Sequence, residues 1–245
     1  MTYCLAITLD AGLVMASDSR TNAGVDNVST YTKMHTFGVP GECQFILLSS
    51  GNLATTQAVI NQLNRDILDD ARRNLFRVRH LFEAAEYIGE LSQQIQRKNN
   101  DGVTIGGYNP EATFLLGGQI GKKPAAIYLI YPQGNYIAAS PYAPFLQIGE
   151  SKYGKPILDR TVYPGLSLED AARCALVSLD STLRSNVSVG LPLDLLIYRR
   201  DSLDEGQRLR FEMDTPYYLA LKASWSQGLR QAFKGLPRFD WEQQN

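Results

Sequence analysis

The stretch that decides the fold is residues 1–20, MTYCLAITLDAGLVMASDSR. TYCLAITLD alternates loosely between apolar and polar residues and meets the turn signal DAG, and LVMASDS follows at once. Two short apolar runs joined by such a turn are typical of antiparallel strands, so we predict a β-hairpin over residues 2–19. A first strand that starts this early needs its amino terminus in a fixed place.

Strands and long helices follow this hairpin. Residues 31–38 and 43–50 are expected to form a second strand pair. Apolar residues at helical spacing predict a helix through Val59, Leu63 and Ile67 and a second helix from about Arg77 to Arg97. Further strands are expected at 112–120, 125–132, 134–140, 192–201 and 207–214, and further helices at 166–185 and 216–233. This order favours an α+β fold with two facing sheets and helices outside them, in one domain over residues 1–245.

Composition excludes several classes of protein. The chain has 245 residues, 44% of them hydrophobic, and a net charge of −1, which gives no bias toward nucleic acid or a membrane surface. No apolar run approaches the roughly 20 residues of a spanning helix. We expect no secretory signal, and the odd, widely spaced Cys4, Cys43 and Cys174 favour reduced cysteines in a cytoplasmic protein. We therefore expect neither a metal nor a cofactor.

Two familiar motifs fail on their spacing. Residues 117–123, GGQIGKK, are too short between the glycines for a phosphate loop and have no Ser or Thr after the lysine pair. Residues 149–154, GESKYG, place the second glycine one residue too far for a nucleophile elbow around Ser151. The two histidines, His35 and His80, both precede this serine, so a Ser–His–Asp hydrolase is poorly supported.

Thr2 is the remaining candidate nucleophile. Removal of Met1, which is common before a small residue, would leave Thr2 with a free α-amine beside its hydroxyl. The amine has an ordinary pKa of about 7.7–8.0, so a substantial neutral fraction can act as the base for the hydroxyl. Many ordinary proteins also begin Met-Thr, so this feature alone decides nothing.

Three other residues strengthen the hypothesis. Asp18 ends the second strand of the hairpin, and Lys33 lies on the next predicted strand, where a carboxylate can position its ammonium. SSGN at 49–52 ends a strand and opens a helix, and Gly51 there suits an oxyanion hole because helix N-termini favour anions. Each residue also has an ordinary explanation as a turn carboxylate, a solvated lysine or a bend.

Together these residues resemble the proteasome β-subunit family of N-terminal-nucleophile hydrolases. The resemblance rests on Thr2, ASDSR with Asp18 and Arg20, Lys33 in YTKMHTF, SSGN with Gly51, and the strand end FLQIGES. It extends over nearly the whole chain and is greatest for bacterial members that begin Met-Thr without a propeptide. The segment from about Glu205 resembles an added strand and helix.

The resemblance implies a four-layer αββα sandwich and self-assembly into a ring-like or spiral homo-oligomer. It implies that Thr2 attacks a peptide or protein substrate, that Asp18 and Lys33 tune the attack, and that Gly51 receives the oxyanion. Arg20 would support the site, and Thr21, Asn22 and Ser49 would contribute to the substrate pocket. Whether an unfoldase partner exists is left open.

The chain departs from the family pattern beside the nucleophile. Glu150 stands where a serine is usual, and the supporting Asp-x-x-Ser pattern aligns with Asn186 and Val189. Ser151 or Ser188 could substitute for the missing groups. Two alternatives to a threonine peptidase therefore stay open: a non-catalytic assembly subunit, and an amidase that acts on a small or conjugated substrate.

Overall fold

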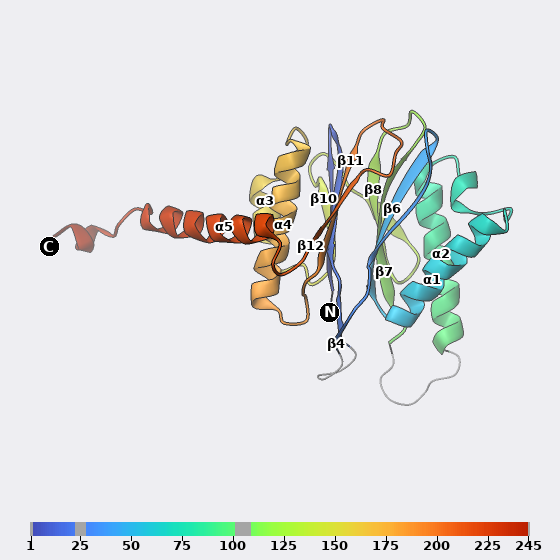
Figure 1. Ribbon diagram of the computed structural model, residues 1–245, viewed down its shortest axis with the longest axis horizontal. Helices are drawn as coiled ribbons and strands as arrows, with labels where there is room; N and C mark the ends of the chain where they lie inside the picture. The colour runs from blue at the N-terminus through green and yellow to red at the C-terminus, as the bar shows by residue number, and fades with distance from the viewer. Residues whose placement is uncertain (1, 23–27, 101–108, 245) are drawn as a thin grey trace.

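A computed structural model describes residues 2–22, 28–100 and 109–244 of the chain. Its core is two five-stranded antiparallel sheets that face each other between two layers of helices (Figure 1). This arrangement confirms the α+β, four-layer αββα sandwich of the N-terminal-nucleophile hydrolase type. Met1, whose removal the sequence predicts, lies outside the described residues.

The first sheet contains the hairpin predicted over residues 2–19. Its strand order is β10-β1-β2-β11-β12, with the bounds β1 Tyr3–Leu9, β2 Gly12–Asp18, β10 Phe145–Gly149, β11 Leu193–Arg199 and β12 Gln207–Phe211. Gly12 makes the tight β1–β2 turn possible because its φ is +146° and a Cβ there would lie 2.0 Å from the Tyr198 carbonyl oxygen.

The second sheet contains the other predicted strand pair. Its order is β5-β6-β7-β8-β9, with the bounds β5 Met34–Val39, β6 Cys43–Gly51, β7 Ala112–Ile120, β8 Ala126–Ile130 and β9 Tyr136–Ala138. A two-stranded ribbon, β3 Arg20–Asn22 and β4 Val28–Thr30, stands apart from both sheets.

Helices cover the outer face of each sheet (Figure 1). The second sheet is covered by α1 Leu53–Leu68 and α2 Leu81–Asn100, and the first by α3 Lys155–Thr161 and α4 Leu168–Ser185. Single 3₁₀ turns occur at Leu75–Arg77 and Asp240–Gln244. The predicted cap of α4 is present, because Ser167 Oγ accepts a hydrogen bond from the Asp170 N–H at 3.0 Å.

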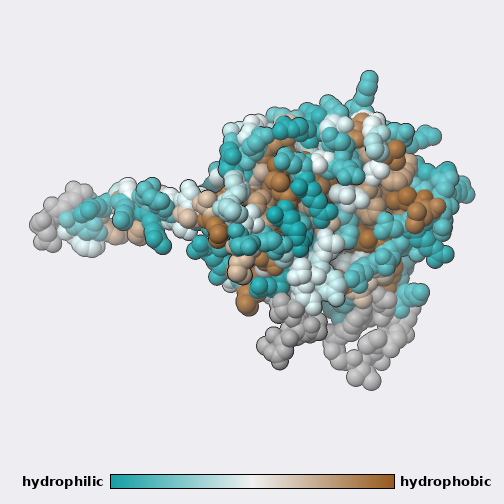
Figure 2. Space-filling view, viewed as in Figure 1, coloured by the Kyte–Doolittle hydropathy of each residue, from teal (hydrophilic) through white to brown (hydrophobic). Residues whose placement is uncertain are grey.

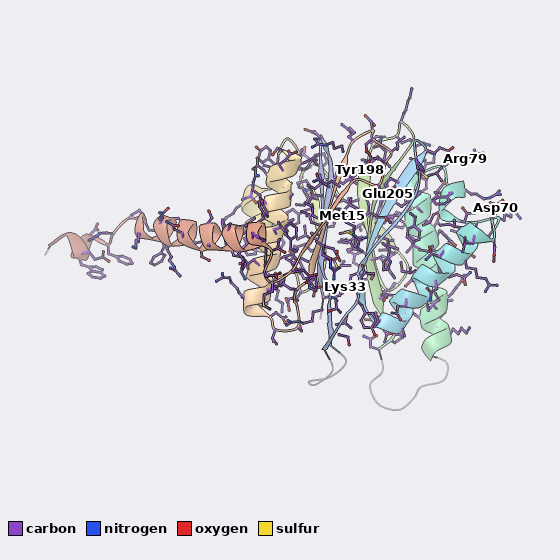
Figure 3. The ribbon with its side chains drawn as sticks, in the orientation of Figure 1. Met15, Lys33, Asp70, Arg79, Tyr198 and Glu205 are labelled. Atoms are coloured by element: carbon purple, nitrogen blue, oxygen red, sulfur yellow. The ribbon has the colours of Figure 1, made fainter. Side chains whose placement is uncertain are left out.

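Alternation along the strands produces three separate apolar layers. Leu5 and Val14 face α4, whereas Ala6 and Met15 face the second sheet. Phe45 and Leu47 point outward against α1 and α2. Figure 3 labels Met15 and Tyr198 in the layer between the sheets, and Lys33 nearer the end at which the N-terminus lies.

The last helix, α5 Pro216–Lys234, extends away from the sandwich (Figure 1). Tyr218 near its start is buried, but every residue from Gln227 to Trp241 is exposed. In Figure 2, this arm carries apolar as well as polar surface. Among the described residues, no helix is both long enough and apolar enough to cross a bilayer.

Two sequence predictions need correction, and two elements were missed. The second helix begins at Leu81 rather than near Arg77, because Asn74 caps a separate 3₁₀ turn ahead of it. Lys33 lies just before β5 rather than on the strand. The short helix α3 and the β3–β4 ribbon were not predicted from the sequence.

Candidate active site

Thr2 is fixed by its backbone at the open end of β1. Its carbonyl oxygen accepts a hydrogen bond from the Glu150 N–H at 2.7 Å. Gly149, which pairs with Tyr3, has a φ of +81°, and a Cβ there would lie 1.9 Å from the Thr2 oxygen. Only glycine permits this close approach, so the IGE sequence at the end of β10 determines where Thr2 lies.

Asp18 is completely buried at the end of β2 and accepts three hydrogen bonds. The donors are the Tyr3 N–H at 3.0 Å, the Gly190 N–H at 3.1 Å and the Lys33 ammonium at 2.7 Å. Burial raises the pKa of the Asp18 carboxyl, and Lys33 and the two N–H groups oppose that rise. The carboxylate therefore connects the start of β1 to the lysine.

Lys33 is 5% exposed and is held from two sides. Its ammonium donates to Asp18 Oδ1 and, at 2.6 Å, to the Arg20 carbonyl oxygen. Its own carbonyl oxygen accepts the Ser49 N–H at 3.0 Å. The buried ammonium is thus hydrogen-bonded to one carboxylate oxygen and one carbonyl oxygen, which fixes its position in the site.

Arg20 supports the site from the side of the α4–β11 loop. Its guanidinium donates to the Val187 carbonyl oxygen at 2.8 Å and lies against Gly190, where a Cβ would be 2.3 Å from Arg20 Nε. Gly190 in turn donates its N–H to Asp18. Arg20 therefore holds the loop that supplies one donor to the buried carboxylate, while its carbonyl oxygen binds Lys33.

A cavity of about 280 Å³ joins most of the predicted residues. Thr2, Lys33 and Gly51 line it, together with Thr21 and Ser49. Gly51, the last residue of β6, has a φ of +112° and is separated from α1 only by the N-cap Asn52, and a Cβ there would lie 2.3 Å from the Glu111 carbonyl oxygen. The cavity thus combines a hydroxyl, an ammonium and the N-terminus of a helix, which are suitable groups for stabilising an oxyanion.

The two supporting serines lie outside the lining of this cavity. The Ser188 hydroxyl donates to Asn186 Oδ1 at 2.5 Å, and the Asn186 amide donates to Glu150 Oε2 at 3.0 Å. The Ser151 carbonyl oxygen accepts the Lys155 N–H at the start of α3. Asn22 ends β3, and its side chain lies outside the described residues.

The structure adds residues that the sequence did not single out. Those that line the cavity are Thr32, Ser50, Leu53, Thr56 and Gly149, and those that hold Asp18 are Tyr3 and Gly190. Thr32 and Ser50 are direct neighbours of predicted residues, so adjacency was a usable signal. Gly190 is 172 residues from Asp18 and carries no local signal.

Across residues 2–22, 28–100 and 109–244, no three His, Cys, Asp or Glu side chains form a group that could hold an ion.

His35 lies in an adjoining hollow with Arg208 and Thr36. Burial and the Arg208 charge lower the pKa of this imidazole, so it is neutral at pH 7.

Comparison with known proteins agrees with this geometry. A family model described as proteasome subunit matches residues 2–195. The Anbu (ancestral beta-subunit) structure from Yersinia bercovieri is 46% identical, with a TM-score of 0.92 over 98% of this chain and 100% of that chain. The helical assembly of the Anbu complex from Pseudomonas aeruginosa contains a chain that is 48% identical, with a TM-score of 0.91 over 97% of this chain and 98% of that one.

Anbu from Hyphomicrobium sp. strain MC1 is 44% identical, with a TM-score of 0.89 over 98% of this chain and 100% of that chain. No curated protein matches the sequence. The family model ends at residue 195, so β12 and α5 lie beyond the residues that it matches. The resemblance seen in the sequence is confirmed: the chain belongs to the proteasome subunit family.

Proposed function

We propose that the chain is a threonine-type peptidase or amide hydrolase whose nucleophile is Thr2 after removal of Met1. The observation that carries the proposal is that Thr2, Lys33 and Gly51 line one cavity while Asp18 holds the Lys33 ammonium at 2.7 Å. Family membership supports the same chemistry. The proposal includes a cytoplasmic location, which the three free, buried cysteines support.

In this mechanism, the Thr2 hydroxyl attacks the scissile carbonyl carbon while the Thr2 α-amine takes its proton. The Lys33 ammonium stabilises the negative charge that develops on the attacking oxygen. The Gly51 N–H donates to the oxyanion, and collapse of the tetrahedral intermediate expels the amine with the proton from the α-amine. Water activated by the same α-amine then hydrolyses the ester and frees Thr2.

The test is covalent labelling of Thr2. Purified protein is incubated with an epoxyketone or β-lactone probe, and intact mass is measured before and after. We expect the mass before labelling to lack Met1 and the mass afterwards to show one adduct, which peptide mapping assigns to Thr2. Thr2→Ser keeps a hydroxyl and tests whether a serine can replace the threonine as nucleophile. Thr2→Ala has no hydroxyl and is the negative control. Retention of Met1, or no adduct while a control peptidase is labelled, contradicts the proposal.

A non-catalytic assembly subunit is the second candidate, and one observation favours it. Glu150 and Asn186 bond to each other beside Thr2, where the family pattern places a serine and an aspartate. An amidase for small or conjugated substrates is the third candidate, because the cavity holds only about 280 Å³. Turnover of a small amide by a protein that does not cleave peptides would favour this third candidate.

We also propose that the chain self-associates through α5 with a second copy of itself. Tyr218, Leu221 and Trp225 lie on one stripe of α5, and Leu229 continues this stripe beyond the sandwich, where it is 50% exposed. An apolar groove of about 700 Å³ lies between α4 and the base of α5, lined in part by Val177. Leu221 and Trp225 also line this groove, so the groove is continuous with the stripe, and a second copy seated there would bury the groove together with Leu229.

The stripe is tested with two variants that add the same charge. Leu229→Glu places a carboxylate on the stripe, and Gln227→Glu places one on the opposite face of the exposed part of α5. We expect light scattering to give a smaller assembly for Leu229→Glu alone. Equal masses for both variants and the unmodified protein would contradict a role for α5 in assembly. The same light-scattering measurement also bears on the substrate. A large multi-subunit assembly with a chamber would favour polypeptide substrates, whereas a dimer would favour small amides.

A further inference from the structure

The strand β12 lies at the same side of the sandwich as the segment that carries Lys33. β12 is the edge strand of the first sheet, and β5, which begins directly after Lys33, is the edge strand of the second. Arg208 on β12 and Thr32 and Met34 beside Lys33 line one hollow of about 380 Å³ between the two edges. A segment beyond the family match therefore reaches the two residues that flank Lys33.

Arg208 contacts the chain on both sides of Lys33. Its guanidinium donates to the Thr32 hydroxyl at 3.5 Å and to the Met34 carbonyl oxygen at 3.4 Å. The Thr32 hydroxyl donates to the same Met34 oxygen at 3.2 Å. Lys33 directly precedes the first ladder residue of β5, and its backbone has one bond to the sheet, from the Ser49 N–H to its carbonyl oxygen, so the two Arg208 bonds add to a backbone that the edge of the sheet holds on one side.

The guanidinium is itself anchored by a buried carboxylate. Asp194 on β11 is 1% exposed, and its Oδ1 lies 3.7 Å from Arg208. Arg210 donates to both oxygens of this carboxylate at 3.2 Å. Asp194 pairs with Ser17 in the sheet, directly beside the pair of Leu193 with Asp18. Asp194, which anchors Arg208, is therefore the direct neighbour of Leu193, the residue that pairs with Asp18.

We propose that Arg208 is a positioning residue that holds the segment Thr32–Met34 so that the Lys33 ammonium stays against Asp18. This inference rests on the proposed function of Thr2 for its catalytic consequence, but the clamp itself concerns only the backbone around Lys33. A planar guanidinium can donate to two oxygens while it faces a carboxylate, which a single ammonium cannot do with the same geometry.

Arg210 provides the matched control for Arg208. Both arginines lie on β12, their side chains are 43% and 44% exposed, and both pair with Asp194. Arg210 bonds to Asp194 and Glu212, and Arg208 alone of the two bonds to Thr32 and Met34. Arg208→Met and Arg210→Met therefore remove the same charge from the same strand, and only the first removes the bonds beside Lys33.

The experiment measures the saturation kinetics of Thr2 labelling by a β-lactone and hydrogen exchange of residues 29–36. For Arg208→Met, we expect the maximal labelling rate to fall about tenfold with unchanged half-saturation, since misplaced catalytic groups slow the chemical step. We expect faster exchange of residues 29–36 in the same variant. Arg210→Met keeps the unmodified protein's values for both, and Arg208→Lys recovers only part of the loss.

The outcomes separate this inference from the proposed function. Equal effects of the two methionine variants, or unmodified labelling and exchange in Arg208→Met, overturn the clamp. If the unmodified protein is not labelled at all, the proposed function fails, and exchange alone decides the clamp. Faster exchange of residues 29–36 confined to Arg208→Met then supports it, and unchanged exchange refutes it.

Discussion

The ammonium of Lys33 lies 2.7 Å from Oδ1 of Asp18, and both side chains are buried in a region that also contains the start of β1. Neither charge has bulk water to solvate it, so each depends on the other. The pair is thus a structural element, to which the proposed mechanism adds a catalytic role, and substitutions can separate the two roles.

Lys33→Met is expected to destabilise the fold by about 3–5 kcal/mol, because it leaves the Asp18 carboxylate buried without its cation. Asp18→Asn together with Lys33→Met removes both charges and should recover only part of that loss, because the Asn amide nitrogen cannot accept from the Tyr3 or Gly190 N–H that it would face. Neither variant should react with the probe. Urea unfolding measures the stability and intact mass measures the labelling. If Lys33→Met were labelled at the rate of the unmodified protein, the Lys33 ammonium would not be required for the reaction of Thr2.

Gly149→Ala should displace Thr2, because the new Cβ would lie 1.9 Å from the Thr2 carbonyl oxygen. Gly41→Ala is the matched control, since Gly41 has a φ of +77° against +81° for Gly149 and nothing within 4 Å of its Cβ position. In both variants the new alanine must adopt a positive φ, which costs about 1 kcal/mol of backbone strain in each. We expect Gly149→Ala alone to lose labelling of Thr2, and equal labelling of both would show that Thr2 tolerates the contact.

Glu150→Ser combined with Asn186→Asp should restore two of the three family residues that the chain lacks near Thr2, with Val189 left unchanged. Asn186→Asp alone is expected to be harmful, because its carboxylate would face Glu150 across the present 3.0 Å hydrogen bond. For the double variant, we expect hydrolysis of the acyl-enzyme to accelerate on the order of tenfold, as is reasonable for a better oriented base. Burst and steady-state rates with an ester substrate measure this step. A double variant no faster than the unmodified protein would show that Glu150 and Asn186 are already adequate.

His35 should make the protein less stable in mild acid. Burial and Arg208 lower the pKa of this imidazole below its ordinary 6.5, so the unfolded chain binds a proton more readily than the folded chain. Stability contributed by neutral His35 is therefore present above pH 6.5 and declines as the pH falls below it. Urea midpoints at pH 7.5 and 5.5 should differ less for His35→Gln than for the unmodified protein. An unchanged difference would assign the acid sensitivity to other groups.

Local chemistry explains what the sequence predicted well. The hairpin over 2–19 has alternating strands and a DAG turn, and the α4 cap has a serine three residues before an aspartate, so neighbouring residues contain the information. Asp18 could be placed near the start of β1 because hairpin pairing brings the two together.

Other features depend on contacts that no local pattern records. α3 has seven residues with a proline at its start, and only Leu158 is buried, so it has no apolar periodicity. The 77–80 segment has an apolar Val78 at helical spacing, yet the Glu83 carboxylate accepts the N–H groups of Arg79 and His80 and so starts the helix later. Arg208 reaches Thr32 across 176 residues of sequence, which only the folded chain brings together.

The bond from the Gly190 N–H to Asp18 spans 172 residues, and this has a consequence for synthesis on the ribosome. At a translation rate of about 5–20 residues per second, the carboxylate emerges roughly ten to thirty seconds before its last backbone donor. Thr2 is thus synthesised first, whereas the last donor to the nearby Asp18 carboxylate is synthesised much later. A nascent chain therefore lacks this donor to Asp18 until the segment around Gly190 has been synthesised, and the proposed active site cannot be complete before then.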